Sequence, residues 1–227
     1  MDLETLEAVN AARAARRAVA AVTDLATGRT RAIAEGEAGE GPLGEAVREA
    51  LRAGTVRTVA VEGAELFVNP HAPPARLVVI GAVHISQALA PMARAAGLDV
   101  LVIDPRGAFA TPERFEGTEL VADWPDETLA ARPLDPHTAL AAVTHDPKID
   151  DGPLLAALQA GCFYVGALGS RKTHAARRGR LLDAGATDAM LDRIEAPIGL
   201  DIGAATPAEI AVAVLGSVIR ARRRRAP

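Results

Sequence analysis

The 227-residue sequence has little of what builds several kinds of functional site. It contains one cysteine, Cys162, and aromatic residues make up only 3% of the chain. A lone thiol cannot form an internal disulfide or a cysteine-rich zinc site, so it is typical of a reducing compartment, and we expect Cys162 to fill core space. The scarcity of aromatic side chains excludes the stacking platforms that bind single-stranded nucleic acid.

Long apolar runs and an excess of positive charge are also missing. No apolar stretch approaches the roughly 20 residues that span a bilayer, and the first residues lack the basic start and apolar core of a secretory signal. The formal net charge of −4 argues against a polyanion as the main partner. These absences predict a cytoplasmic protein that binds neither nucleic acid nor a membrane.

Apolar residues nonetheless make up 49% of the sequence, and their spacing predicts two domains. The first is a small α+β module, with helices expected at 3–17 and 42–53 and hairpins at 18–34 and 56–68. The segment 69–74 carries three prolines, Pro70, Pro73 and Pro74, which we expect to exclude it from any helix or central strand. We therefore divide the chain into 1–70 and 71–227.

Strands and helices alternate after this segment, which indicates a parallel sheet covered on both faces. The last helix has a complete start, because Thr206, Pro207 and Glu209 form the pattern of a capping box with proline at the first helical position. The expected fold class is α/β, a Rossmann-like parallel sheet with the small N-terminal α+β module. Its strands are expected at 77–80, 100–103, 119–122, 139–144 and 163–165, and its helices at 86–96, 126–131, 152–160, 172–182 and from 206 onward.

The stretch 76–106 has the pattern of the first half of a nucleotide-binding Rossmann unit. Gly81 permits the tight turn between strand and helix, but Val83 stands where the fingerprint has its second glycine, and Ser86 where it has its third. A branched side chain at 83 should obstruct the approach of a pyrophosphate. His84 and Ser86 would then meet an anion with side-chain donors, and the alternative is a structural turn without a ligand.

Asp104 ends the second strand of this unit, where a carboxylate usually accepts the ribose hydroxyls of NAD. Arg106 follows two residues later and could serve a phosphate, so NAD, NADP and other nucleotides stay open. The alternative is an Asp-Pro turn with a surface arginine.

The segment Thr144-His145-Asp146 follows a strand at the same expected edge of the sheet. We expect His145 and Asp146 to form hydrogen bonds or handle protons, and they are the only catalytic candidates. Asp146, Asp150 and Asp151 match no tight metal-binding signature, so no metal site is predicted.

A second anion site is predicted at 166–172. Gly166 and Gly169 free the backbone, Ser170 is a natural helix cap, and Arg171 places a cation at a helix start, where it opposes the helix dipole unless an anion is present. The alternative is a salt bridge to the acidic segment 146–151. Asp201, in the glycine-containing loop 198–204, could face the ligand from a lid or satisfy local amides.

Several of these segments, taken together and in order, resemble the XdhC/CoxI family of accessory proteins for molybdenum-containing hydroxylases such as xanthine dehydrogenase. The resemblance covers about residues 74–220 and rests on Gly81-Ala82-Val83-His84-Ile85, residues 102–106, Phe109-Ala110, Glu113-Arg114-Phe115, Thr144-His145-Asp146, residues 164–171, residues 197–204 and Thr206-Pro207-Ala208-Glu209-Ile210. The sequence departs from the family at Val83, where glycine is frequent. It also lacks the Gly-Gly-Cys-Val-Glu motif that longer members carry in an N-terminal domain.

The resemblance implies a Rossmann domain that binds the molybdenum cofactor, as molybdopterin or its dinucleotide form, and helps protect or insert it into a hydroxylase apoenzyme. It also implies a cleft with one end formed by Gly81, His84, Asp104 and Arg106, and the other by His145, Asp146, Gly169, Ser170, Arg171 and Asp201. This favours a chaperone over an enzyme. The alternatives are an NAD(P)-dependent oxidoreductase that uses the same cleft, with His145 as acid or base, and a purely structural binding module. Pairing of two copies through the last helix stays open.

Overall fold

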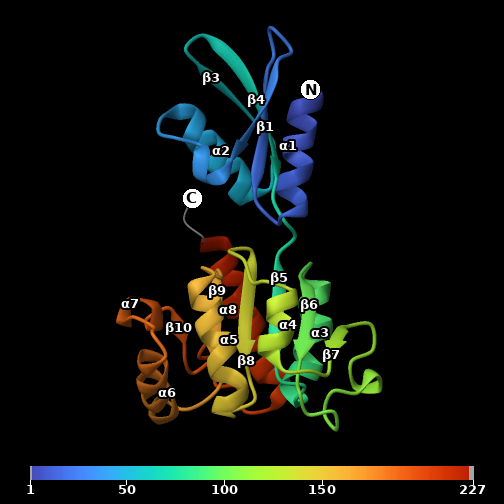
Figure 1. Cartoon of the computed structure of the whole chain (residues 1–227), viewed down its shortest axis with the longest axis vertical. Coiled ribbons are helices and arrows are strands. Elements are labelled where there is room, and N and C mark those ends of the chain that lie inside the picture. The colour runs from blue at the N-terminus through green and yellow to red at the C-terminus, as the bar shows by residue number, and fades with distance from the viewer. Residues whose placement is uncertain (1, 225–227) are drawn as a thin grey trace. The chain divides into compact units, whose positions relative to one another are not determined.

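The computed structural model describes residues 2–224, and their contacts form two compact units that adjoin in the chain at Pro73 and Pro74 (Figure 1). The N-terminal unit is built on an antiparallel sheet with the strand order β2-β1-β4-β3. Its elements are α1 (Leu3–Ala14), β1 (Val19–Asp24), β2 (Thr30–Ala34), η1 (Glu35–Glu37), α2 (Pro42–Ala53), β3 (Arg57–Val61) and β4 (Ala64–His71).

Alternate residues of β1 face opposite sides of this small sheet, and a helix packs against each set. Val19 and Ala21 pack with Val9 of α1 on one face. Ala20 packs with Val47 of α2 on the other. The N-terminal unit is therefore a three-layer α/β/α arrangement.

The proline-rich segment differs from its prediction, because β4 continues through Asn69 and Pro70 to His71 and pairs there with β1. Pairing of β4 with β3 ends at Val68. Beyond Val68 that side of β4 is open, so the missing N–H of Pro70 interrupts no ladder there. Pro70 thus belongs to β4, an inner strand of the sheet, which is contrary to the expectation that these prolines exclude a central strand.

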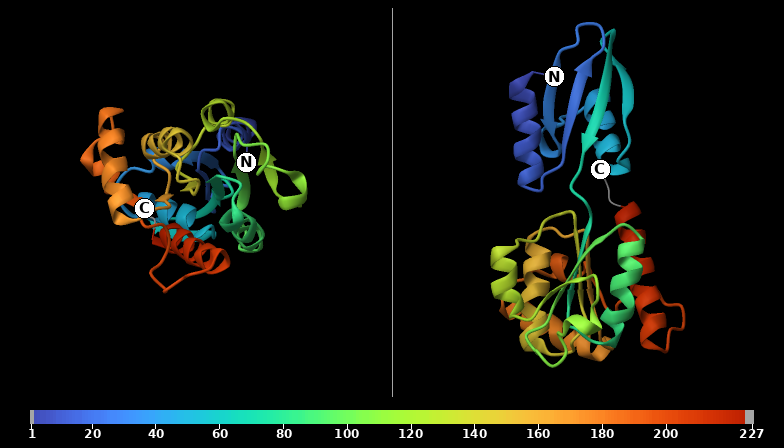
Figure 2. Two further views of the ribbon diagram at one scale, coloured as in Figure 1. Left: turned by 90° about the horizontal axis from the view of Figure 1, so that it is seen from below. Right: turned by 90° about the vertical axis from the view of Figure 1, so that its right-hand side faces the viewer.

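The C-terminal unit has six parallel strands in the order β10-β9-β8-β5-β6-β7, with helices on both faces (Figure 2, right). This is the doubly wound order 3-2-1-4-5-6 of a Rossmann fold, with β5 as the first strand, and it confirms the predicted fold class. The elements are β5 (Arg76–Ile80), α3 (His84–Ala95), β6 (Asp99–Ile103), η2 (Pro112–Arg114), β7 (Glu119–Val121), α4 (Pro125–Ala131), β8 (Thr138–Ala142), α5 (Pro147–Gln159), β9 (Tyr164–Ala167), α6 (Arg171–Asp183), α7 (Asp188–Leu191), β10 (Ile194–Glu195) and α8 (Pro207–Arg224).

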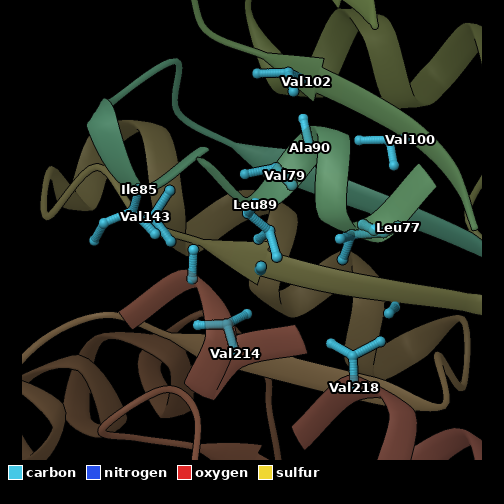
Figure 3. Packing of buried hydrophobic residues seen from close by; sticks show 14 of the residues in the cluster. Leu77, Val79, Ile85, Leu89, Ala90, Val100, Val102, Val143, Val214 and Val218 are labelled. Atoms are coloured by element: carbon cyan, nitrogen blue, oxygen red, sulfur yellow. The ribbon is translucent and has the colours of Figure 1, made fainter. Parts of the chain in front are cut away.

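The central strand β5 divides its side chains between two apolar clusters. Leu77 and Val79 pack with residues of α3 and α8, as Figure 3 shows for Leu89, Val214 and Val218. Val78 and Ile80 belong to the opposite cluster, with residues of α4, α5, α6 and α7. An uninterrupted apolar strand is what such two-sided burial requires.

Three elements of the C-terminal unit differ from the sequence-based prediction. The helix expected from Gly152 begins at Pro147, because Asp146 caps it by accepting a hydrogen bond from the N–H of Lys148 at 3.0 Å. The short α7 and the two-residue β10 were not predicted, since elements of that length carry no readable periodicity. Within 2–224, every helix is too short or too polar to cross a membrane.

Candidate functional site

Most of the predicted site residues lie in the segments that follow β5, β6, β8 and β9, at the edge of the sheet that we call the carboxyl edge. The chain reverses its direction of winding between β5 and β8, and open α/β sheets bind ligands at this point. Gly81 follows β5 with φ of 117°, and a Cβ on it would lie 2.7 Å from Cγ2 of Thr144, the second residue after β8. Only glycine fits the turn, because two loops of the carboxyl edge touch there.

Helix α3 begins at the carboxyl edge without a side-chain cap from any residue in 2–224. Its first residue, His84, is exposed, whereas Val83 is half-buried and packs against the apolar core. Ser86 is fully buried, and its hydroxyl donates a hydrogen bond to the carbonyl of Gly81. This corrects the expectation that Ser86 meets an anion, because its hydroxyl closes the turn.

Asp104 lies at the carboxyl edge after β6, but its carboxylate is 0% exposed. Oδ2 accepts hydrogen bonds from the N–H of Ala82 at 2.7 Å and from Nη2 of Arg106 at 2.7 Å. Oδ1 accepts from the backbone N–H and Nε of Arg106, both at 2.9 Å. The expected contact of Asp104 with a ribose is corrected, because four donors already surround the carboxylate.

The pair Asp104–Arg106 stays ionised. Burial alone would raise the pKa of Asp104, but the hydrogen bonds from Arg106 and Ala82 outweigh it and hold that pKa below its ordinary value. The hydrogen bonds to Asp104 raise the pKa of Arg106, and the charges of Asp146 and Asp150 add to this. Arg106 therefore lies within electrostatic reach of the loop that follows β8.

The loop after β8 holds a strained residue, because His145 has φ of 68°. Its backbone N–H donates to Oδ2 of Asp150 at 3.1 Å. The hydroxyl of Thr144 donates to Oδ1 of Asp150 at 2.7 Å and accepts from the N–H of Asp146 at 3.0 Å. This network fixes the backbone of His145, whose side chain is exposed.

Two carboxylates have structural duties, Asp146 in this loop and Asp150 in the first turn of α5. Asp146 caps α5. Asp150 is fully buried, and desolvation raises its pKa to about 6, although the hydrogen bond from Thr144 and the charge of Arg177 act in the opposite direction. The sequence pattern did not identify Asp150 as the support of His145, because nothing in it shows that the side chain of Asp150 faces the protein interior from the first turn of α5.

The two glycines of the second predicted anion site lie in different environments. Gly166 is buried inside β9, where a Cβ would lie 2.6 Å from the hydroxyl of Tyr164 and 2.7 Å from Cγ1 of Ile198, so its predicted ligand contact is corrected to a packing role. Gly169, with φ of 134°, lies at the carboxyl edge. Ser170 caps α6 by accepting from the N–H of Thr173 at 3.2 Å. Arg171 and Lys172 are exposed at the helix start.

Arg177 is a buried supporting residue that the sequence did not reveal among the many basic residues of α6. Its side chain is 2% exposed, and Nη2 donates to the carbonyl of Leu168 at 3.0 Å. Nε lies 3.8 Å from Asp151, and neither Nε nor Nη1 has a hydrogen-bond partner within residues 2–224. Burial lowers the pKa of Arg177 against the opposing charges of Asp150 and Asp151. Arg177 thereby links the loop after β9 to α5.

The acidic segment 146–151 also binds α6 at its surface, because Arg180 donates to Asp151 from Nε at 2.6 Å and from Nη2 at 3.2 Å. Salt bridges to the acidic segment were the predicted alternative to an anion site at 166–172. They are formed here by Arg177 and Arg180, which lie later in α6. No salt bridge is formed by Arg171 or Lys172 with the described residues.

Asp201 is exposed in the loop before α8. Glu195 anchors this loop, because its Oε1 accepts from the N–H of Gly199 and from the hydroxyl of Tyr164, each at 2.9 Å. Its Oε2 accepts from Ser217 at 2.5 Å and from Arg220 at 2.8 Å. The sequence did not identify Glu195, since its partners lie on three separate elements.

Metal ligands do not gather anywhere in 2–224, where no group of three His, Cys, Asp or Glu side chains could hold an ion. Cys162 is fully buried, and desolvation raises its pKa to about 12. As a protonated core thiol it is not available as a thiolate ligand.

Comparison with known proteins identifies relatives of the C-terminal unit. A family model described as the XdhC Rossmann domain matches residues 77–218. A probable xanthine dehydrogenase subunit from Bacillus subtilis (strain 168) is 32% identical over 160 residues, which are 70% of this chain and 46% of that protein. The molybdenum cofactor insertion chaperone PaoD of Escherichia coli (strain K12) is 30% identical over 150 residues, 66% of this chain and 41% of that protein.

The likeness to a solved structure extends to both units. The crystal structure of a xanthine dehydrogenase from Bacillus halodurans has a TM-score of 0.65 and 25% sequence identity, and the match covers 99% of this chain and 66% of that chain. The chain spans less than half the length of the two curated relatives above. The matched range of the family model is well over half of the sequence, and it contains every motif of the carboxyl edge. The chain therefore belongs to the XdhC family and carries its Rossmann domain.

Proposed function

We propose that this chain binds the molybdenum cofactor, as molybdopterin or its dinucleotide form, and helps protect or insert it into a xanthine dehydrogenase-type hydroxylase apoenzyme. The cofactor is then cargo, and the chain acts as a cytoplasmic chaperone. The relative PaoD is named a molybdenum cofactor insertion chaperone, which supports this role. Pairing of two copies stays a prediction.

The observation that carries the proposal is the occupied carboxylate of Asp104. An NAD-dependent enzyme needs this carboxylate for the ribose, whereas here Arg106 and Ala82 take both oxygens. This arrangement argues against a dehydrogenase that binds NAD in its usual pose. It leaves the phosphate of a pterin as the group that suits the basic and backbone donors of the carboxyl edge.

The donor set fits the organic part of the cargo and not its metal. The uncapped start of α3, the half-buried Arg106 and the exposed His145 and Arg171 are suited to phosphate and pterin oxygens. Residues 2–224 offer no accessible thiolate for molybdenum, because Cys162 is buried and protonated. We assign ligand contacts to Gly81, His84, Arg106, His145, Gly169, Ser170, Arg171 and Asp201, and supporting roles to Ser86, Asp104, Asp146 and Gly166.

The proposal is tested on the full chain purified from cells with intact cofactor synthesis. Pterin fluorescence after oxidation and molybdenum by mass spectrometry should both approach one equivalent per chain. The same preparation is titrated with NADPH and assayed for reduction of carbonyl substrates. A blank for pterin, or tight NADPH binding with carbonyl turnover, would overturn the accessory role.

A further inference from the structure

We propose that the ligand places a phosphate, and not a ribose diol, at the end of β6, where Nη1 of Arg106 binds it. The inference rests on the proposed function and names the chemical group that one part of the carboxyl edge selects. Two observations carry it, the occupied carboxylate of Asp104 and the fixed orientation of Arg106.

A diol needs a carboxylate with oxygens that are free and accessible. Asp104 offers neither, because it is 0% exposed and receives four N–H donors within 2.9 Å. Displacing Arg106 to free the carboxylate would leave a buried charge without its partner, which is strongly unfavourable. A ligand with a diol at this position would therefore lose affinity.

Arg106 offers hydrogen-bond donors to the ligand, where a free carboxylate would offer acceptors. Nε and Nη2 are engaged by Asp104, and one face of the guanidinium lies 4.6 Å from the ring centroid of Phe109. Nη1 has no acceptor among residues 2–224, and the side chain is 34% exposed. The group thus offers one accessible N–H edge, and a phosphate oxygen is the acceptor that forms the strongest hydrogen bond with it.

The loop that carries Phe109 stabilises the orientation of Arg106. Phe109 is 42% exposed, yet its carbonyl accepts from Nη1 of Arg114 at 2.7 Å. Nη2 of Arg114 donates to Oε1 of Gln87 on α3 at 3.1 Å. The loop that carries Phe109 is therefore tied to α3, so little side-chain freedom is lost when the ligand binds.

The start of α3 adds to the attraction at this position. The N–H of Ala82, just before the helix, already bonds to Asp104, and the first turn of α3 has no side-chain cap in the described chain. A phosphate beside Nη1 of Arg106 would share the positive end of this 12-residue helix. The nearby carboxylates do not compete, because Asp146 caps α5 and Asp150 bonds to Thr144 and His145.

The test uses two forms of one probe, the fluorescent pterin that oxidation of molybdopterin yields, with its terminal phosphate and after phosphatase treatment. Dissociation constants are measured by fluorescence for the full chain. We expect the phosphorylated form to bind about tenfold or more tightly, because a charge-assisted hydrogen bond is worth that much. Arg106→Gln should reduce the ratio of the two dissociation constants to below about threefold.

Further variants separate binding from folding. Asp104→Asn/Arg106→Gln removes both charges and keeps an amide oxygen for the N–H of Ala82, so it should fold and still lack the preference. Arg106→Lys should keep part of the preference for the phosphorylated form. Arg132→Ala is the matched control, since Arg132 pairs with Glu119 at the start of β7, at the opposite edge of the sheet, and it should bind as the wild type does.

The outcomes distinguish this inference from the proposed function. Equal binding of both probe forms to the wild type would overturn the inference and leave the pterin-binding role standing. A phosphate preference that survives Arg106→Gln, or an equal loss of both forms in the double variant, would overturn the assignment of Arg106. Failure of the wild type to bind either form would overturn both.

Discussion

The backbone N–H of His145 donates a hydrogen bond to the buried carboxylate of Asp150 at 3.1 Å, and this bond holds a residue with φ of 68°. A non-glycine residue in this conformation costs free energy unless its surroundings impose it. Here Thr144 bonds to the same carboxylate. His145 therefore reaches the carboxyl edge in a fixed backbone conformation before any ligand binds.

Loss of the Thr144 hydroxyl should weaken this support. Thr144→Val removes the donor to Asp150 and the acceptor for the N–H of Asp146, while retaining the methyl group that touches Gly81. We expect the free energy of unfolding to fall by about 2 kcal/mol, measured by urea denaturation. Thr144→Ser, which keeps the hydroxyl, should lose less, and an equal loss in both variants would contradict the hydrogen-bond account.

Asp150 should make stability depend on pH. Burial raises its folded-state pKa from 3.8 to about 6, so between these values the folded chain binds more protons at this group than the unfolded chain does. Its contribution to stability is therefore largest below pH 4 and falls as the pH rises through 6. Asp150→Asn removes this pH-dependent contribution to the free energy of unfolding.

The measurement is urea denaturation of the wild type and Asp150→Asn from pH 4 to pH 7. The variant loses hydrogen bonds at every pH, but the difference in unfolding free energy should move in its favour as the pH rises. A difference that is constant over this range would show that Asp150 does not titrate there.

Gly166→Ala tests whether that glycine packs or binds. The added Cβ would lie 2.6 Å from the hydroxyl of Tyr164 and 2.7 Å from Cγ1 of Ile198, so we expect a loss of about 2 kcal/mol in unfolding free energy. Gly179→Ala is the matched control, because Gly179 is exposed in α6 with nothing within 4 Å of its Cβ position. That variant should gain about 0.5–1 kcal/mol. Undiminished stability of Gly166→Ala would reject the packing role.

Arg171→Ala should weaken ligand binding more than folding, because Arg171 is exposed at the start of α6. With the phosphorylated pterin as probe, we expect an increase of several-fold in the dissociation constant and an unchanged denaturation midpoint. Arg178→Ala serves as control, since Arg178 pairs with Asp188 and Asp192 further along. Equal affinity in the wild type and Arg171→Ala would remove Arg171 from the site.

The fold of the C-terminal unit followed from patterns that one sequence contains. Apolar strands buried on two faces, turns at glycine and the capping box of α8 each carry a local signal. The box is present, because Glu209 accepts from the N–H of Thr206 at 2.9 Å and its own N–H donates to the hydroxyl of Thr206 at 3.3 Å. The order of the strands then follows from the rules for doubly wound sheets.

The direction of side chains at the carboxyl edge could not be predicted in the same way. Ser86, Asp104 and Gly166 all occur where a ligand contact is expected, yet the side chains of Ser86 and Asp104 point into the protein and Gly166 is buried inside β9. A sequence shows that a residue follows a strand, but tertiary neighbours decide which way its side chain turns. Arg177 and Glu195 were missed for the same reason, because their partners come from distant segments.

The two helices of the N-terminal unit cover its sheet unequally. Helix α2 packs on one face against β1, β3 and β4, whereas α1 packs on the other face against β1 and β2 and leaves Thr58, Ala60 and Glu65 exposed there. The outermost strands, β2 and β3, each pair on one side only, and their unpaired backbone groups form the free perimeter. An added strand can therefore pair with β2, with β3, or with the end of β4 beyond Val68, which β3 leaves unpaired.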